Sequence, residues 1–118
     1  MERLTRKEEE AMKILWKAKK GFINELLVFY GEPKPHYNTL SSLIRGLEEK
    51  GYVNHKAYGK NHEYYPVVTK EDYRKSLMKE VVDDFFDSSY KNVVLSFINE
   101  KKISRQDLKA MIKLMDKR

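Results

Sequence analysis

One segment of this 118-residue chain, residues 52–68, has side chains that repeat with a period of two, whereas helical spacing precedes and follows it. Val53, His55 and Ala57 are expected to face one way, and the Gly59-Lys60-Asn61 turn separates them from a second alternating run. Two such runs, rich in β-branched and aromatic residues, predict a β-hairpin. The chain is therefore expected to be mainly α-helical with one small β-hairpin.

Apolar residues at helical spacing predict three helices before the hairpin, over residues 5–19, 23–30 and 37–50. Thr5 and Glu8 form a capping box at the start of the first helix, and Gly21 is expected to end it. Two prolines within residues 31–35 keep the second helix from continuing, and Gly51 follows the third.

Three helices followed by a hairpin predict a winged helix-turn-helix domain. In that fold the third helix enters the major groove of DNA, and the hairpin, called the wing, lies against the DNA backbone. We assign this DNA-binding domain to residues 1–68 and a C-terminal helical dimerisation region to residues 69–118. A length of 118 residues suits one small domain with such an appendage.

The third predicted helix begins with short polar side chains, which permit close approach to base edges. Asn pairs well with adenine, Ser and Thr reach either base type, and Arg reaches a guanine edge or a phosphate. The same side chains also suit a helix cap or a solvated helix face. The candidate DNA-binding residues are Lys34, Tyr37, Asn38, Thr39, Ser41, Ser42, Arg45, Lys56 and Lys60.

Charge is distributed unevenly along the chain, whose net charge is +6 and whose pI is about 9.4. Residues 33–62 hold five Lys or Arg against two Glu, whereas residues 81–100 hold one Lys against three Asp and one Glu. The basic excess therefore coincides with the third helix and the hairpin. It favours an anionic partner, with double-stranded DNA as the first candidate.

The last 50 residues predict three amphipathic helices that open at Thr69, Ser89 and Ser104. These helices are small for an independent core, so we expect a second copy to cover their apolar faces by two-fold symmetry. The alternative is that they fold back onto the winged helix. The candidate dimerisation residues are Tyr73, Leu77, Val81, Phe85, Phe86, Phe97, Ile98, Leu108, Met111, Ile112 and Met115.

The sequence lacks the residues that several kinds of functional site require. The chain has no cysteine, which excludes disulfides, thiolate zinc sites and iron–sulfur clusters. The three histidines are scattered in the sequence and do not indicate a metal site, and no cofactor or catalytic group is predicted, so we do not expect an enzyme. No apolar run is long enough to enter a membrane, and the first residues lack a secretory pattern, so we expect a cytoplasmic protein.

Four segments, residues 4–16, 32–41, 47–53 and 59–66, resemble the penicillinase repressor family (BlaI, MecI and CopY). The most specific reads Glu-Pro-Lys-Pro-His-Tyr-Asn-Thr over residues 32–39. The resemblance implies a dimeric, cytoplasmic transcriptional repressor that binds palindromic operators through its N-terminal winged helix. It also places Lys34, Tyr37, Asn38, Thr39, Ser42 and Arg45 at recognition-helix positions and Lys56 and Lys60 in the wing.

The chain departs from the family pattern at two positions. Gly46 stands where a second basic residue is common, and Ser96 replaces the Asn of an Asn–Phe bond that a membrane sensor protease cuts in β-lactam-responsive members. By this resemblance Ser96–Phe97 is the predicted cleavage site. The lack of cysteine excludes the copper-sensing mode of other members.

Two further functions remain open at this point. A winged-helix regulator that senses a small molecule would make the same DNA contacts and release DNA on binding its ligand. A winged-helix protein-interaction module would use the basic face for an acidic protein and would not bind DNA. The dependence of DNA affinity on salt distinguishes these possibilities.

Overall fold

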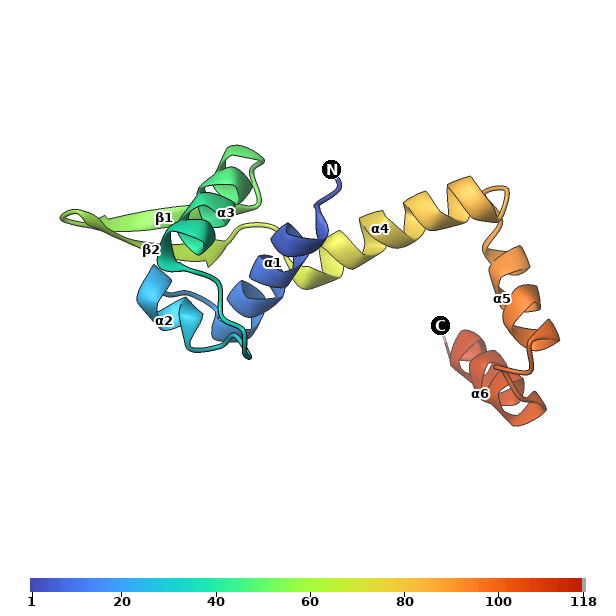
Figure 1. Ribbon diagram of the computed structural model, residues 1–118. Helices are drawn as coiled ribbons and strands as arrows, with labels where there is room; N and C mark the ends of the chain where they lie inside the picture. Colours follow the sequence, from blue (N-terminus) through green and yellow to red (C-terminus); the bar gives the residue numbers. More distant parts are fainter. Residues whose placement is uncertain (118) are drawn as a thin grey trace. The chain divides into compact units, whose positions relative to one another are not determined.

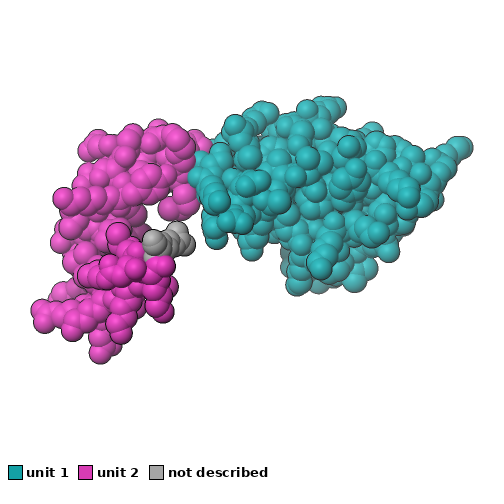
Figure 2. Space-filling model, turned by 180° about the vertical axis from the view of Figure 1, so that it is seen from behind, with its two compact units in different colours: residues 1–76 teal, residues 77–118 magenta. Residues whose placement is uncertain are grey.

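The computed structural model describes residues 1–117, which form six helices and one two-stranded antiparallel hairpin (Figure 1). The predicted fold class, a winged helix-turn-helix followed by helices, is confirmed. The elements are α1 (Arg6–Ala18), α2 (Ile23–Leu27), α3 (Tyr37–Glu49), β1 (Val53–Tyr58), β2 (Asn61–Pro66), α4 (Lys70–Phe85), α5 (Tyr90–Asn99) and α6 (Arg105–Asp116). The chain divides into two compact units, residues 1–76 and 77–118 (Figure 2). A functional division at residue 68 stays a prediction.

The first unit is built around a core to which α1, α2, α3 and the hairpin all contribute. Apolar side chains at helical spacing place one buried stripe on each helix, and these stripes meet. The largest side chains that are completely buried in this unit are Met12, Leu15, Leu26, Leu40, Ile44, Leu47 and Tyr52. This packing fixes α3 relative to the hairpin and leaves its polar side outside.

The end of α1 differs from the prediction. Lys19, and not Gly21, caps the helix, with a left-handed φ of 74° and a backbone N–H that donates to Leu15 O at 2.7 Å. Gly21 instead pairs with Tyr64 of β2, and each backbone N–H donates to the other's carbonyl oxygen at 2.9 Å. An added Cβ on Gly21 would lie 3.0 Å from Leu26 Cδ2, so its small size suits this close approach.

The second helix is shorter than predicted, since α2 ends at Leu27 and not near Tyr30. The next three N–H groups donate to carbonyl oxygens three residues back, as in a tighter turn. In this turn Val28 is 72 % and Phe29 is 42 % exposed. The apolar spacing that predicted a longer helix therefore does not correspond to a longer buried face.

The hairpin has the predicted alternation. Its register pairs Val53 with Pro66, His55 with Tyr64 and Ala57 with His62, so these residues share one face. The turn between the strands is two residues long, and Gly59 holds a left-handed φ of 63° there. Gly51, with a φ of 84°, ends α3 as predicted and starts the connection to β1.

An aromatic cluster fastens the start of α4 to the winged helix. Trp16 Nε1 donates to Val68 O at 2.9 Å, and the Tyr73 ring lies 5.9 Å from the rings of both Trp16 and Tyr52. The Tyr73 hydroxyl donates to Glu9 Oε2 at 2.5 Å. Burial and this hydrogen bond raise the pKa of Tyr73 to about 12. Tyr73 was predicted for dimerisation, but its side chain is already covered by its own unit.

The second unit begins within α4. Ser89 Oγ accepts from Asn92 N at the start of α5, and Ser104 and Asp107 form a capping box at the start of α6, as predicted. Val82 is completely buried, whereas α5 and α6 have no buried residue. The strongly exposed apolar side chains of this unit are Met78, Phe85, Tyr90, Val94, Leu95, Phe97, Met111, Ile112, Leu114 and Met115. None of the helices in residues 1–117 has the length and apolarity to cross a membrane.

A buried carboxylate links the start of α1 to the end of α3. Glu8 is 7 % exposed, and its Oε1 accepts from Thr5 N at 2.9 Å and from Lys50 Nζ at 2.8 Å. Burial opposes the charge of Glu8, but the hydrogen bonds from Lys50 and Thr5 outweigh it, so the pKa of Glu8 falls below its ordinary 4.5. The sequence predicted the capping box, which is confirmed, but not the partner Lys50.

Replacing Glu8 by Gln should lower the free energy of unfolding by about 1–2 kcal/mol at neutral pH, because a charged hydrogen bond becomes a neutral one. A lowered folded-state pKa means that this contribution is complete above about pH 4.5 and disappears as pH falls through the folded-state value. Urea unfolding of both proteins across this range measures it. A difference that stayed constant down to the acid limit would contradict the role of the charge.

Candidate nucleic-acid interface

The exposed side of α3 is polar from its first residue. Because Leu40, Ile44 and Leu47 are buried, the side chains about half a turn away point outward. These outward residues are Asn38, Ser42, Arg45 and Glu49, all exposed. His36 caps the helix, and its side chain makes no capping hydrogen bond to the first N–H groups. The short polar residues predicted for base contact therefore stand on an open surface.

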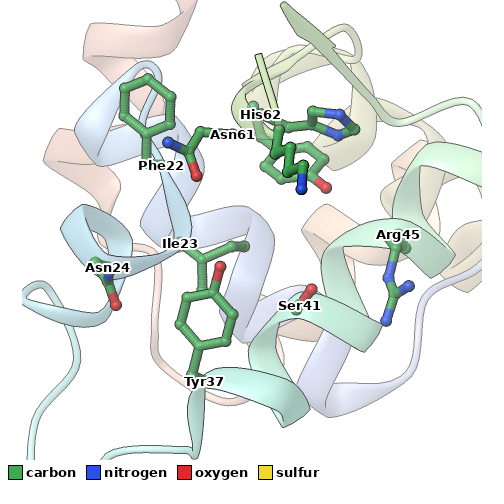
Figure 3. Close-up of a pocket in the computed structure, with 10 residues that line it drawn as sticks. Phe22, Ile23, Asn24, Tyr37, Ser41, Arg45, Asn61 and His62 are labelled. Carbon is green, nitrogen blue, oxygen red and sulfur yellow. The ribbon is translucent and has the colours of Figure 1, made fainter. Parts of the chain in front are cut away.

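A groove of about 460 Å³ runs between α3 and the hairpin, and we call it the wing groove (Figure 3). Tyr37, Ser41 and Arg45, at four-residue spacing, form its α3 side. Lys60 and His62 line it from the hairpin. The complete lining is Phe22, Ile23, Asn24, Tyr37, Ser41, Arg45, Lys60, Asn61, His62 and Tyr64.

Other predicted DNA-binding residues lie on the opposite flank of α3. Asn38, Thr39 and Ser42 line a second depression together with Thr5 and Lys50. Gly46 also lies there, and an added Cβ at this position would meet nothing within 4 Å. Packing around the Cβ position therefore does not require glycine at 46.

Two predicted lysines lie apart from the wing groove. Lys34 lines a third depression, between the two prolines that flank it and beside Tyr30 and Thr39. Lys56 is on the face of the hairpin opposite His55, and its Nζ lies 5.2 Å from the centre of the Tyr58 ring. The structure thus brings Lys60, but neither Lys34 nor Lys56, together with Arg45.

The predicted DNA-binding residues include four of the ten residues that line the wing groove, and Asn24 and His62 are among the six that they leave out. Asn24 lines the groove from α2, and the neighbouring Phe22 and Ile23 also line it (Figure 3). The signal for Asn24 was available, because the first helix of a helix-turn-helix, here α2, crosses the DNA backbone and its exposed polar residues are candidates. His62 was treated as a scattered histidine, although the predicted alternation already placed it on the same hairpin face as Tyr64.

The structure brings two of the three histidines together. The rings of His55 and His62 stack with centroids 4.0 Å apart and planes 5° from parallel, and we call them the histidine pair. His55 Nδ1 lies 2.6 Å from Glu48 Oε2, so one member of the pair is held by α3. Within residues 1–117 no three His, Asp or Glu side chains are grouped to bind a metal ion.

The profile of the penicillinase repressor family matches residues 4–117. The chain belongs to this family. The match confirms the resemblance seen in the sequence, and the members of this family are transcriptional repressors. The function of this penicillinase repressor family member must therefore account for three features: the winged helix, the polar face of α3 and the wing groove.

Curated members of the penicillinase repressor family are distant relatives. The methicillin resistance regulatory protein MecI of Staphylococcus aureus strain N315 is 23 % identical over 112 residues, which cover 94 % of this chain and 91 % of that protein. The penicillinase repressor of Bacillus licheniformis is 22 % identical over 110 residues, covering 92 % and 86 %. Both alignments extend over the winged helix and the C-terminal helices.

Proposed function

We propose that this protein is a cytoplasmic transcriptional repressor that binds a palindromic double-stranded operator as a homodimer. The first half of α3 enters the major groove, where Asn38, Thr39 and Ser42 contact base edges and Arg45 contacts a guanine edge or a phosphate. Lys60 holds the backbone from the wing. Membership of the repressor family supports this proposal.

One observation carries the proposal beyond family membership. Arg45 and Ser41 on α3 line the same groove as Lys60 at the wing tip, and this groove runs beside the exposed polar face of α3. A DNA strand needs this combination, with short polar groups for bases and cations beside them for phosphates. Glu48 and Glu49 at the end of α3 repel phosphates, so only the start of the helix approaches DNA.

The operator sequence can be found by letting the full-length chain select duplexes from a random-sequence pool. For the selected duplex, log K should fall linearly with log salt concentration, with a slope near −0.9 for each phosphate contacted. Failure to select any duplex at low salt would contradict the proposal and favour the protein-interaction module. A ligand that lowers the operator affinity of the intact protein would instead favour the small-molecule regulator.

Two substitutions should separate base contacts from backbone contacts. Asn38→Ala should relax sequence preference at one position in each half-site, with a loss of about 1–3 kcal/mol, because a base partner disappears. Lys60→Ala should weaken binding to all duplexes alike and flatten the salt slope by about one unit. Titration of both variants with the selected duplex and with a scrambled one measures this. Identical behaviour of the two variants would contradict the placement of α3 in the groove.

The homodimer is proposed because large apolar side chains are exposed in residues 77–118. Phe85 is 78 %, Met115 73 % and Ile112 57 % exposed within a single chain. Exposed apolar area of this kind marks an interface, and a second copy covers it most simply by two-fold symmetry. The proposed interface comprises Leu77, Val81, Phe85, Phe86, Phe97, Ile98, Leu108, Met111, Ile112 and Met115.

Release of DNA by a membrane sensor protease is proposed through the bond between Ser96 and Phe97. Both residues lie within α5, where Ser96 is half-buried and Phe97 is 43 % exposed. A protease needs an extended segment, so α5 must open locally before cleavage. Incubation with the cognate protease should yield a fragment that ends at Ser96. An intact chain after incubation with a demonstrably active protease would exclude this mode of release.

A further inference from the structure

The histidine pair lies at the edge of the proposed DNA-binding surface and has no part in the function proposed above. His62 lines the wing groove, whereas His55 stacks on it from β1 and is held at 2.6 Å by Glu48 of α3. The side chain of Glu48 is 27 % and that of His55 28 % exposed, so this link is partly shielded from water. The two rings therefore have fixed positions beside the groove.

Charged and titratable groups approach the pair from every element packed around it. Glu48 bonds His55 from α3, and Arg45 and Tyr37 of α3 line the groove with His62. Tyr64 of β2 contacts both rings, at centroid distances of 5.7 and 6.0 Å, and Lys60 lines the groove from the turn. Burial raises the pKa of Tyr64, so its hydroxyl is neutral near pH 7. The charged groups around the pair are thus the Glu48 carboxylate and the side chains of Arg45 and Lys60.

Positive charge is already concentrated on the groove side of the histidine pair. Arg45 and Lys60 line the wing groove together with His62, whereas Glu48 holds His55 on the side of α3. A positive charge on both rings, stacked at 4.0 Å, would add to this repulsion. Histidine is the side chain that gains its charge between pH 5 and 8, and a phosphate that entered the groove would offset the repulsion.

We propose that His62 is a further DNA-backbone contact and that DNA binding takes up a proton at the histidine pair. A phosphodiester in the wing groove supplies negative charge beside His62, and the His62 imidazolium then donates a hydrogen bond to it. This inference rests on the proposed function. It adds that DNA affinity increases as pH falls, because the complex holds more protons than the free protein.

The experiment is titration of the full-length dimer with its selected duplex from about pH 8 down to about pH 6, where histidine gains its charge. Affinity should rise by up to about tenfold for each pH unit, which corresponds to one proton. Calorimetry in two buffers of different ionisation enthalpy should show proton uptake on binding. A scrambled duplex should give the same pH dependence, since the contact is to the backbone.

Three variants test whether His62 causes the pH dependence of DNA binding. His62→Gln should lose the pH dependence and the proton uptake, because glutamine cannot take up a proton. His62→Lys, which carries a permanent charge, should bind at pH 8 with the affinity that the natural chain reaches only at low pH. His36→Gln is the matched control, because this histidine lies before α3 and outside the pair. Thermal unfolding checks that all three fold.

The outcomes separate this inference from the proposed function. Operator binding that is independent of pH, or a pH dependence that survives in His62→Gln, overturns the inference and leaves the repressor proposal standing. A pH dependence abolished by His36→Gln also overturns it. If no duplex binds at any pH, both proposals fail. Loss of the pH dependence only in the two His62 variants supports the inference.

Discussion

Phe85→Asp should convert the proposed dimer into a monomer and lower operator affinity by about 100- to 10,000-fold. Phe85 is 78 % exposed at the end of α4, and it belongs to the apolar side chains that we propose contact the partner copy. A carboxylate there would have to be buried without a partner, which is strongly unfavourable. The affinity loss follows because two joined winged helices bind with a high effective concentration, whereas a monomer binds one half-site at a time.

Sedimentation velocity and operator titration measure the two parts of this prediction separately. Lys91→Gln is the matched control, since it lowers the net charge by the same one unit at an exposed position in α5. A Phe85→Asp protein that remained dimeric would remove Phe85 from the interface. A monomer with undiminished affinity for the complete operator would show that DNA binding does not need the dimer.

Trp16→Ala should lower the free energy of unfolding by about 3 kcal/mol or more, in the range for loss of a large aromatic side chain. The substitution removes the ring that packs on Tyr73 and the indole N–H that bonds Val68 O. Both partners lie around the start of α4, so its first turns would lose much of their attachment to the winged helix. Urea unfolding measures the stability.

The matched variant Trp16→Phe keeps an aromatic ring but has no N–H. It should lower the free energy of unfolding by about 1 kcal/mol, the usual contribution of one hydrogen bond. Equal losses in the two variants would mean that the bond to Val68, and not ring packing, holds the start of α4. A negligible loss in Trp16→Ala would remove the aromatic cluster as the attachment.

Features that depend on near neighbours could be predicted from the sequence. The capping box at Thr5 and the helix start at Ser104 depend on residues only three positions apart, and both occur as predicted. The hairpin alternation likewise follows from a local period and a glycine turn. The family itself was recognisable because the segment at residues 32–39 is continuous in the sequence.

Features that depend on distant partners could not be predicted in the same way. Gly21 looked like a helix end, but its pairing with Tyr64 depends on residues more than forty positions away. Lys50 gave no sign that it would bond Glu8, and Tyr73 looked like one more residue of an apolar stripe until Trp16 and Tyr52 covered it. Packing across the fold overrides the periodic pattern in each case.

The candidate site combines features that depend on near neighbours with features that depend on distant partners. The polar start of α3 is a local feature, and its exposure follows from the buried stripe. Which lysines share a groove with Arg45 depends on the course of the hairpin, so Lys60 and Lys56 could not be distinguished beforehand. The histidine pair also depends on the hairpin register. The two-residue turn pairs Ala57 with His62 and puts both rings on one face, whereas the predicted three-residue turn would have placed them on opposite faces.

The pairing of Gly21 with Tyr64 anchors the wing near its base and leaves its tip less constrained. Two directional hydrogen bonds fasten its root, whereas nearer the tip the rings of Phe22 and Tyr58 meet at 5.7 Å, a contact that resists sliding much less. We therefore expect the tip to shift sideways more readily than the root. Since groove width varies with DNA sequence, we expect such a wing to follow different backbone contours without moving the helix that we propose for base contact.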